Sequence, residues 1–299
     1  MNPASGYILT ETLAENREAG TWTTVLRAAV AGLKVKIVAV ASDEASGLIS
    51  HIEKGLGAVH LPDLFHMQRE LWKALAGPLA RGLKASAKAL AKAEAVTAYW
   101  RGRQAAHAAG ERPVGRPPNF EQHIAAAEAQ EAQARATYDA AEARQATTHA
   151  AIRAIGDAYH PVDLETGALR DAATVEADLG AAFVTIDENA HAIGLAEKHR
   201  ERIDKARRVM PKMVAAIAFF FAHTGRCLTE LALGEEAHAL VREALIPGLY
   251  LATLAKRAPT VAYTGPRRSR IPDDGDQGFR SMAIRDSGAS RSIFGGRPE

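Results

Sequence analysis

Cysteine is almost absent from this 299-residue chain, because Cys227 is its only thiol. One cysteine cannot form an internal disulfide framework or a cysteine-rich zinc site, and it indicates a reducing compartment. Aromatic residues are also scarce, at 6%, although the hydrophobic fraction reaches 47%. Alanine therefore carries much of the apolar content. Since alanine is the best helix former and a poor strand residue, the composition predicts a mainly helical protein.

Long hydrophobic runs and secretion signals are missing as well. The longest apolar run, Met213 to Ala222, is roughly half the length that spans a bilayer, and Met1 to Ser5 carries no basic residue that could start a signal peptide. These absences predict a cytoplasmic protein with no membrane partner. The sequence also lacks a glycine-rich phosphate loop, a serine nucleophile elbow and an HExxH zinc motif, so none of those chemistries is indicated.

The formal net charge of +2 does not by itself indicate a partner. Residues 256–299 hold nine Lys or Arg and five Asp or Glu, a net of +4, so the body of the chain is about −2. Beyond Pro259 the sequence loses its hydrophobic periodicity. Such a segment cannot bury enough apolar surface to offset its loss of conformational entropy, so residues 259–299 are predicted to form a disordered basic tail.

The first 75 residues alternate between strand and helix patterns. Alternating apolar residues predict a strand over 6–13, helical spacing predicts a helix over 21–33, and short apolar runs predict strands at 35–40 and around Val59. This is only a fragment of an α/β sheet, too small for a doubly wound domain. Asp43 follows the second strand, at the position where an α/β sheet presents functional side chains.

Long helices are predicted from residue 64 onward. Helices over 64–109 and 120–158, the second capped by Asn119, are separated by the breaker 111–118 and predict an antiparallel hairpin. A group of further helices is expected at 172–183, 188–208, 211–233 and 235–255, the last interrupted at Pro247. The apolar side chains expected in the core of this group are Met213, Ile217, Phe220, Phe221, Leu228 and Leu231.

The predicted fold class is therefore mainly α with a small α/β portion. We expect four regions: a partial α/β core (1–75), a long antiparallel helical hairpin (76–158), a helical bundle (159–258) and a disordered basic tail (259–299).

Asp43 has two interpretations from spacing alone. Ser42-Asp43-Glu44 before a helical run is typical of a helix N-cap with an acidic first turn, and spacing favours this role over a metal ligand. Metal binding by His51, His60 and His66 is not favoured, since these histidines are spread over several elements without an i,i+4 pair. His66 is expected to be a hydrogen-bonded histidine near the core.

Two basic clusters lie on predicted helices. The larger one consists of Lys198, Arg200, Arg202, Lys205, Arg207, Arg208 and Lys212. Basic stripes neutralise phosphates in nucleic-acid binding, but interspersed Glu197, Glu201 and Asp204 are equally consistent with a solvated face of helical ion pairs. The smaller cluster, Lys84, Lys88 and Lys92, is expected to be a solvated face.

A family resemblance is carried by Ser42-Asp43-x-x-x-Gly47-Leu48, followed by Phe65-His66 before a long helix. With the surrounding run from Ser5 to Leu71, this segment resembles the interior of the catalytic domain of bacterial insertion-sequence transposases of the Asp-Asp-Glu class, including the Mutator-like group. The resemblance implies a ribonuclease-H-like fold. The helices through about residue 258 resemble the all-α insertion that these enzymes place between the second Asp and the final Glu.

In that family three carboxylates hold two divalent ions, Mg²⁺ by preference, about 4 Å apart. The resemblance gives Asp43 the second-aspartate position, and we expect the first Asp and the final Glu to be missing from this chain. It thus implies a truncated, catalytically inactive transposase whose partners are DNA and a second copy or a full-length transposase. The alternative is a non-enzymatic helical coiled-coil interaction or DNA-binding protein in which Asp43 only caps a helix.

Overall fold

The computed structural model describes residues 10, 12, 13, 16, 18–111 and 116–262. The predicted strand over 6–13 falls almost entirely outside these residues, as does the predicted tail beyond Ala262. The described chain is mainly helical and contains one two-stranded parallel sheet, as the sequence predicts. It divides into two units, residues 1–234 and 235–299.

A small α/β segment opens the first unit. Helix α1 (Ala19–Val30) is followed by strand β1 (Ala39–Ser42), helix α2 (Ser46–Ser50), the π-helical stretch η1 (His51–Leu56) and strand β2 (Val59–Pro62). The strands pair in parallel, with Ala39 opposite Val59 and Ser42 opposite Pro62. The prediction of a strand at 35–40 is therefore displaced by about one strand length. Pairing with the four-residue β2 selects residues 39–42, whereas Val35 is 60% exposed.

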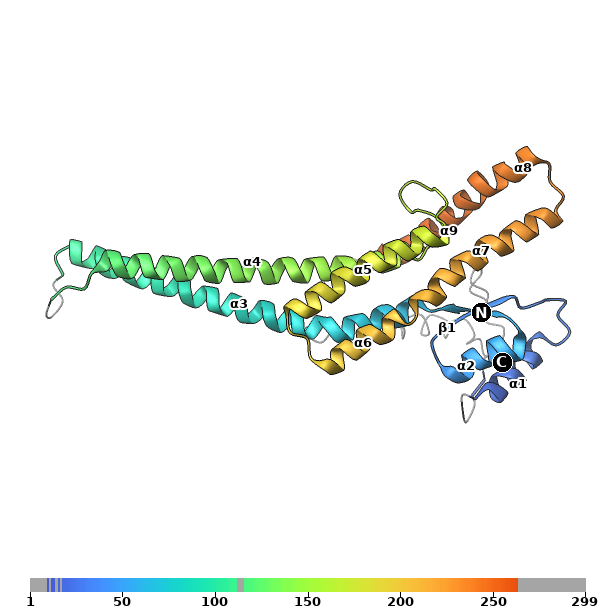
Figure 1. Cartoon of the computed structure of the whole chain (residues 1–299), viewed down its shortest axis with the longest axis horizontal. Coiled ribbons are helices and arrows are strands. Elements are labelled where there is room, and N and C mark those ends of the chain that lie inside the picture. The colour runs from blue at the N-terminus through green and yellow to red at the C-terminus, as the bar shows by residue number, and fades with distance from the viewer. Residues whose placement is uncertain (1–9, 11, 14–15, 17, 112–115, 263–299) are drawn as a thin grey trace, which may run out of the picture. The chain divides into compact units, whose positions relative to one another are not determined.

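Helices α3 (Leu64–Ala108) and α4 (Phe120–Ala158) form the predicted antiparallel hairpin, side by side in Figure 1. Local signals set their starts. The Asp63 side chain accepts a hydrogen bond from Phe65 N at 2.9 Å, and Asn119 Oδ1 accepts one from Gln122 N at 3.1 Å. These N-caps confirm the predicted boundaries. Helix α3 continues across Pro78 without ending there.

The hairpin seam changes along its length. Where α3 begins and α4 ends, large side chains such as Leu71, Leu75 and Ile152 are completely buried. Towards the tip the buried residues are small, among them Ser86, Thr97 and Ala127. Small seam residues let two helix axes approach closely over many turns.

Helices α5 (Ala172–Ala192), α6 (Glu197–Arg207) and α7 (Met210–Glu230) pack onto the base of the hairpin and complete the core. The predicted break between 183 and 188 is wrong, because Ile186 continues the buried stripe of α5. That helix ends instead before Gly194, whose φ of +58° suits glycine. Leu231, predicted in the core, is 64% exposed because it lies just beyond the end of α7.

The second unit is described up to Ala262. It contains α8 (Glu235–Leu240), the π-helical stretch η2 (Val241–Leu245) and α9 (Ile246–Ala262). The predicted interruption at Pro247 is wrong, since α9 runs through it. The preceding π-helical hydrogen bonds reach one residue farther than α-helical ones, which suits a residue without an N–H. No helix among the described residues is long and apolar enough to cross a membrane.

Candidate functional site

Asp43 lies immediately beyond the last residue of β1, as the sequence predicts. Its Oδ1 accepts a hydrogen bond from Ala45 N at 3.3 Å. Helix α2 begins only at Ser46, and the residue in its N-cap position, Ala45, makes no side-chain cap. Asp43 therefore stabilises the turn that leads into α2 and does not cap the helix directly.

A polar cluster surrounds this strand end, formed by Ser42, Glu44, His60 and Lys212. The imidazole of His60 is buried, with Nε2 2.9 Å from Ser42 Oγ. Lys212 on α7 donates a hydrogen bond to Glu44 Oε2 at 2.7 Å. The other carboxylate oxygen, Glu44 Oε1, lies 3.9 Å from His60 Nδ1, and both atoms are buried without a hydrogen-bond partner among the described residues.

The cluster fastens the sheet to α7. Helix α7 packs against β2, and the Lys212–Glu44 pair joins it to the loop after β1. The 3.9 Å gap is wide enough for one water molecule to bridge the carboxylate and the imidazole. Sequence reasoning missed this cluster because Glu44 and Lys212 are 168 positions apart. The available signals were the adjacency of Glu44 to Asp43 and the polar His60 within an apolar run.

The metal site that the family resemblance implies needs several carboxylates around one point. No group of three or more His, Cys, Asp or Glu that could hold a metal ion comes together among the residues with a described placement. The carboxylate beside Asp43, Glu44, is already paired with Lys212. The described residues therefore do not supply the ligands of a two-magnesium centre.

A second polar contact joins α1 to η1. The buried His51 places Nδ1 2.7 Å from Thr23 Oγ1. Burial, and to a smaller extent the positive charge of Arg27, lowers the pKa of His51. His66, expected near the core, is instead a partly exposed partner of Asp63, with Nδ1 2.7 Å from Oδ2.

The structure divides the larger basic cluster into two groups. In the first, Arg202 pairs with Glu70 on α3 at 2.9 Å, Arg207 pairs with Asp187 on α5, and Lys212 pairs with Glu44. Arg200 Nε donates to the Leu195 carbonyl at 2.7 Å. These four residues connect elements of the fold.

The second group consists of Lys198, Lys205 and Arg208, which are exposed and form no ion pair within the described part of the chain. At about 100° per residue they share one side of α6, opposite the buried Ile203 and Ala206. Glu201 lies on the same side. This group can contact an anionic partner, whereas the paired residues are already engaged.

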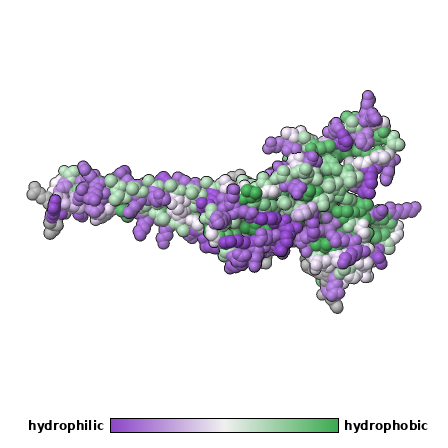
Figure 2. Space-filling model, viewed as in Figure 1, coloured by the Kyte–Doolittle hydropathy of each residue, from purple (hydrophilic) through white to green (hydrophobic). Residues whose placement is uncertain are grey.

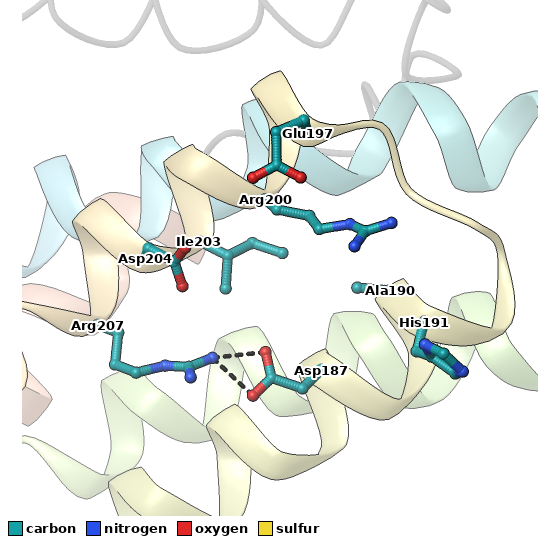
Figure 3. Close-up of a pocket in the computed structure, with 8 residues that line it drawn as sticks. All are labelled: Asp187, Ala190, His191, Glu197, Arg200, Ile203, Asp204 and Arg207. Atoms are coloured by element: carbon teal, nitrogen blue, oxygen red, sulfur yellow. Dashed lines mark hydrogen bonds and ion pairs between the residues drawn. The ribbon is translucent and has the colours of Figure 1, made fainter.

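A hollow of about 280 Å³ lies between α5 and α6 (Figure 3). The Arg207 guanidinium binds both Asp187 oxygens, at 2.5 and 2.6 Å. It also lies 5.3 Å from the centre of the Phe183 ring. Glu197, Asp204 and Arg200 complete the charged lining. With its Arg207 engaged by Asp187 and two further carboxylates in the wall, the hollow does not favour an anion.

His199 marks where positive charge accumulates between α3 and α6. Its pKa is lowered, first by burial and then by the charges of Lys198, Arg202 and Arg81. Arg81 belongs to α3, so cations from two helices lie close to one imidazole.

No protein-family model, curated protein or solved structure matches this chain. The geometry above and the resemblance around Asp43 therefore carry the functional conclusion.

Proposed function

We propose that this chain is a transposase-derived DNA-binding protein, related to insertion-sequence transposases with a ribonuclease-H-like core, that does not cut DNA strands. The observation that carries the proposal is the position of Asp43, a carboxylate at the carboxyl end of β1 in a parallel strand–helix–strand unit. Ribonuclease-H-like cores hold metal-binding carboxylates on a strand framework of this kind.

The proposed loss of cleavage rests on the ligand set. Two-metal chemistry needs several carboxylates around one point. Asp43 is occupied in a turn and Glu44 is paired with Lys212, so Mg²⁺ would find too few ligands here. DNA binding requires no metal, because phosphates are neutralised by Lys and Arg.

Two assays with the purified full chain test this proposal. Fluorescence anisotropy with a labelled duplex should show salt-dependent binding, and a supercoiled plasmid incubated with Mg²⁺ should stay intact. Asp43→Asn should leave binding unchanged. Nicking that disappears in Asp43→Asn would show that the metal site is complete, and an absence of DNA binding would contradict the proposed function.

A second candidate is a helical interaction protein, which exposed apolar residues of the second unit support. Leu240, Leu245 and Leu249 are all exposed. Spacings of five and four residues across a π-helical stretch place them on one side of the helical segment. Sedimentation would reveal a concentration-dependent dimer that Leu245→Glu abolishes. Dimerisation without any DNA binding would favour this candidate over the first.

A further inference from the structure

The outer face of α3 carries a continuous row of basic side chains. At about 100° per residue, six exposed residues fall within an arc of about 100°. They are Arg81, Lys84, Lys88, Lys92, Tyr99 and Arg103. We call this set the α3 basic face. Between its members lie small residues, including Ala85, Ala95 and Gly102.

This face points away from α4. The buried seam of α3, with Leu79, Leu90 and Thr97, lies on the opposite side of the helix. The acidic residues of α3 are not on the face, and both are engaged elsewhere: Glu70 with Arg202 of α6, and Glu94 with Arg135 of α4. The five cations of the face form no ion pair within the described residues. Their charge is therefore available to a partner.

The length of the face can be compared with DNA. From Arg81 to Arg103 the helix rises about 33 Å at 1.5 Å per residue. One turn of B-form DNA is about 34 Å long. Figure 2, in the orientation of Figure 1, shows mostly hydrophilic and small side chains on the visible side of the hairpin towards its tip. A rod-like polyanion would meet positive charge along this whole length.

We infer that the α3 basic face is a binding surface for the phosphate backbone of double-stranded DNA. This inference rests on the proposed DNA-binding function and assigns it a surface. The cations at 81, 84, 88, 92 and 103 neutralise phosphates, and the intervening alanine and glycine residues let the duplex approach the helix closely.

The composition of the face selects a duplex over other anionic partners. Single strands are bound by several aromatic side chains that stack on bases, whereas this face has Tyr99 alone, 56% exposed and packed edge-on against Trp100. A membrane-surface helix needs large apolar side chains beside its cations. Here alanines occupy those positions.

Positive charge continues from this face onto α6. Arg81 lies near His199, together with the exposed Lys198. Lys205 and Arg208 extend the exposed cations along α6. The hairpin and α6 together offer a duplex a longer positive surface than α3 alone.

The test compares three variants of the full chain with equal loss of charge. The first is Lys84→Gln/Lys88→Gln/Lys92→Gln on the α3 basic face. The matched control, Lys34→Gln/Lys36→Gln/Lys54→Gln, removes three exposed lysines of the α/β segment. A third variant, Lys198→Gln/Lys205→Gln/Arg208→Gln, measures the share of α6. Binding of a duplex of about two helical turns is followed by anisotropy over a range of salt concentrations, and circular dichroism checks that each variant folds.

Each lost phosphate contact should flatten the slope of log K against log salt by about 0.9. The α3 variant should therefore lose about 2.7 of the slope and weaken at least about tenfold near 100 mM salt, while the control stays close to the unmodified protein. An α3 variant that behaves like the control would overturn the inference and leave the proposed function standing. Failure of the unmodified protein to bind any duplex would contradict both. Preferential binding of single strands would contradict the choice of partner.

Discussion

The two helices of the hairpin are similar in length and opposite in charge. Helix α3 carries eight Lys or Arg against two Asp or Glu, a net charge of +6, whereas α4 carries three against six, a net of −3. The buried seam that joins them contains no charged residue. Packing therefore does not require the difference. Charge on the outer faces can vary independently of the seam, and the positive face is the one that suits a polyanion.

The largest expected effect concerns the part that the helices share, the base of the hairpin. Leu75→Ala should lower the free energy of unfolding by about 2–5 kcal/mol, because Leu75 is fully buried among α3, α4 and α5 side chains and its removal leaves a cavity. Urea denaturation measures this change. Val184→Ala, an exposed position on α5, should stay within about 0.5 kcal/mol. Equal effects at the two positions would contradict the assignment of the core.

The N-caps separate the base of the hairpin from its tip. Asp63→Ala and Asn119→Ala each remove a side-chain acceptor from the first turn of a helix, at a cost of about 1 kcal/mol. At the base, the loss at Asp63 should appear in global unfolding. At the tip, the loss at Asn119 should appear mainly as faster amide hydrogen exchange in the first turn of α4. The reverse pattern would show that the tip unfolds together with the core.

Helix α4 provides a direct counterpart to the basic face. Removing three of its acidic side chains with Glu121→Gln/Glu131→Gln/Asp139→Asn should tighten duplex binding by less than about threefold, since charges beyond a Debye length of about 10 Å are largely screened. The measurement is the same anisotropy titration at physiological salt. A change as large as that of the α3 variant would mean that net charge, and not one face, determines binding.

The smallest effect is a dependence of stability on pH where α3 meets α6. The pKa of His199 in the folded protein is lowered from its usual 6.5, so the unfolded chain binds the proton more readily. Stability is then complete above about pH 6.5 and declines as the pH falls below it. His199→Asn should reduce this decline, measured by urea unfolding at about pH 7.5 and 5.5. Because the pKa values of His51, His149 and His160 are lowered too, part of the decline should remain.

The hairpin was predictable from sequence because its signals are local. Asp63 and Asn119 cap the helices, the breaker at 111–118 separates them, and both predicted ranges lie within a residue of the structure. The strand after α1 was misplaced because pairing with β2 selects its residues, and that information is not local.

The site residues divide in the same way. The position of Asp43 at a strand end followed from its neighbours in sequence, whereas the Glu44–Lys212 contact depends on how α7 packs on the sheet. The α3 basic face was visible in part, at Lys84, Lys88 and Lys92, but only the whole helix shows that the face has no acidic residue and points away from α4.

The most direct test of the contrast between the two helices is site-specific photo-crosslinking to a duplex. In a Cys227→Ser background, a crosslinker is attached through Ala95→Cys on the α3 basic face or through Ala136→Cys on the outer face of α4, both exposed positions. The account predicts strong DNA crosslinks from position 95 and background levels from position 136. Equal yields at the two positions, or a higher yield from α4, would contradict it.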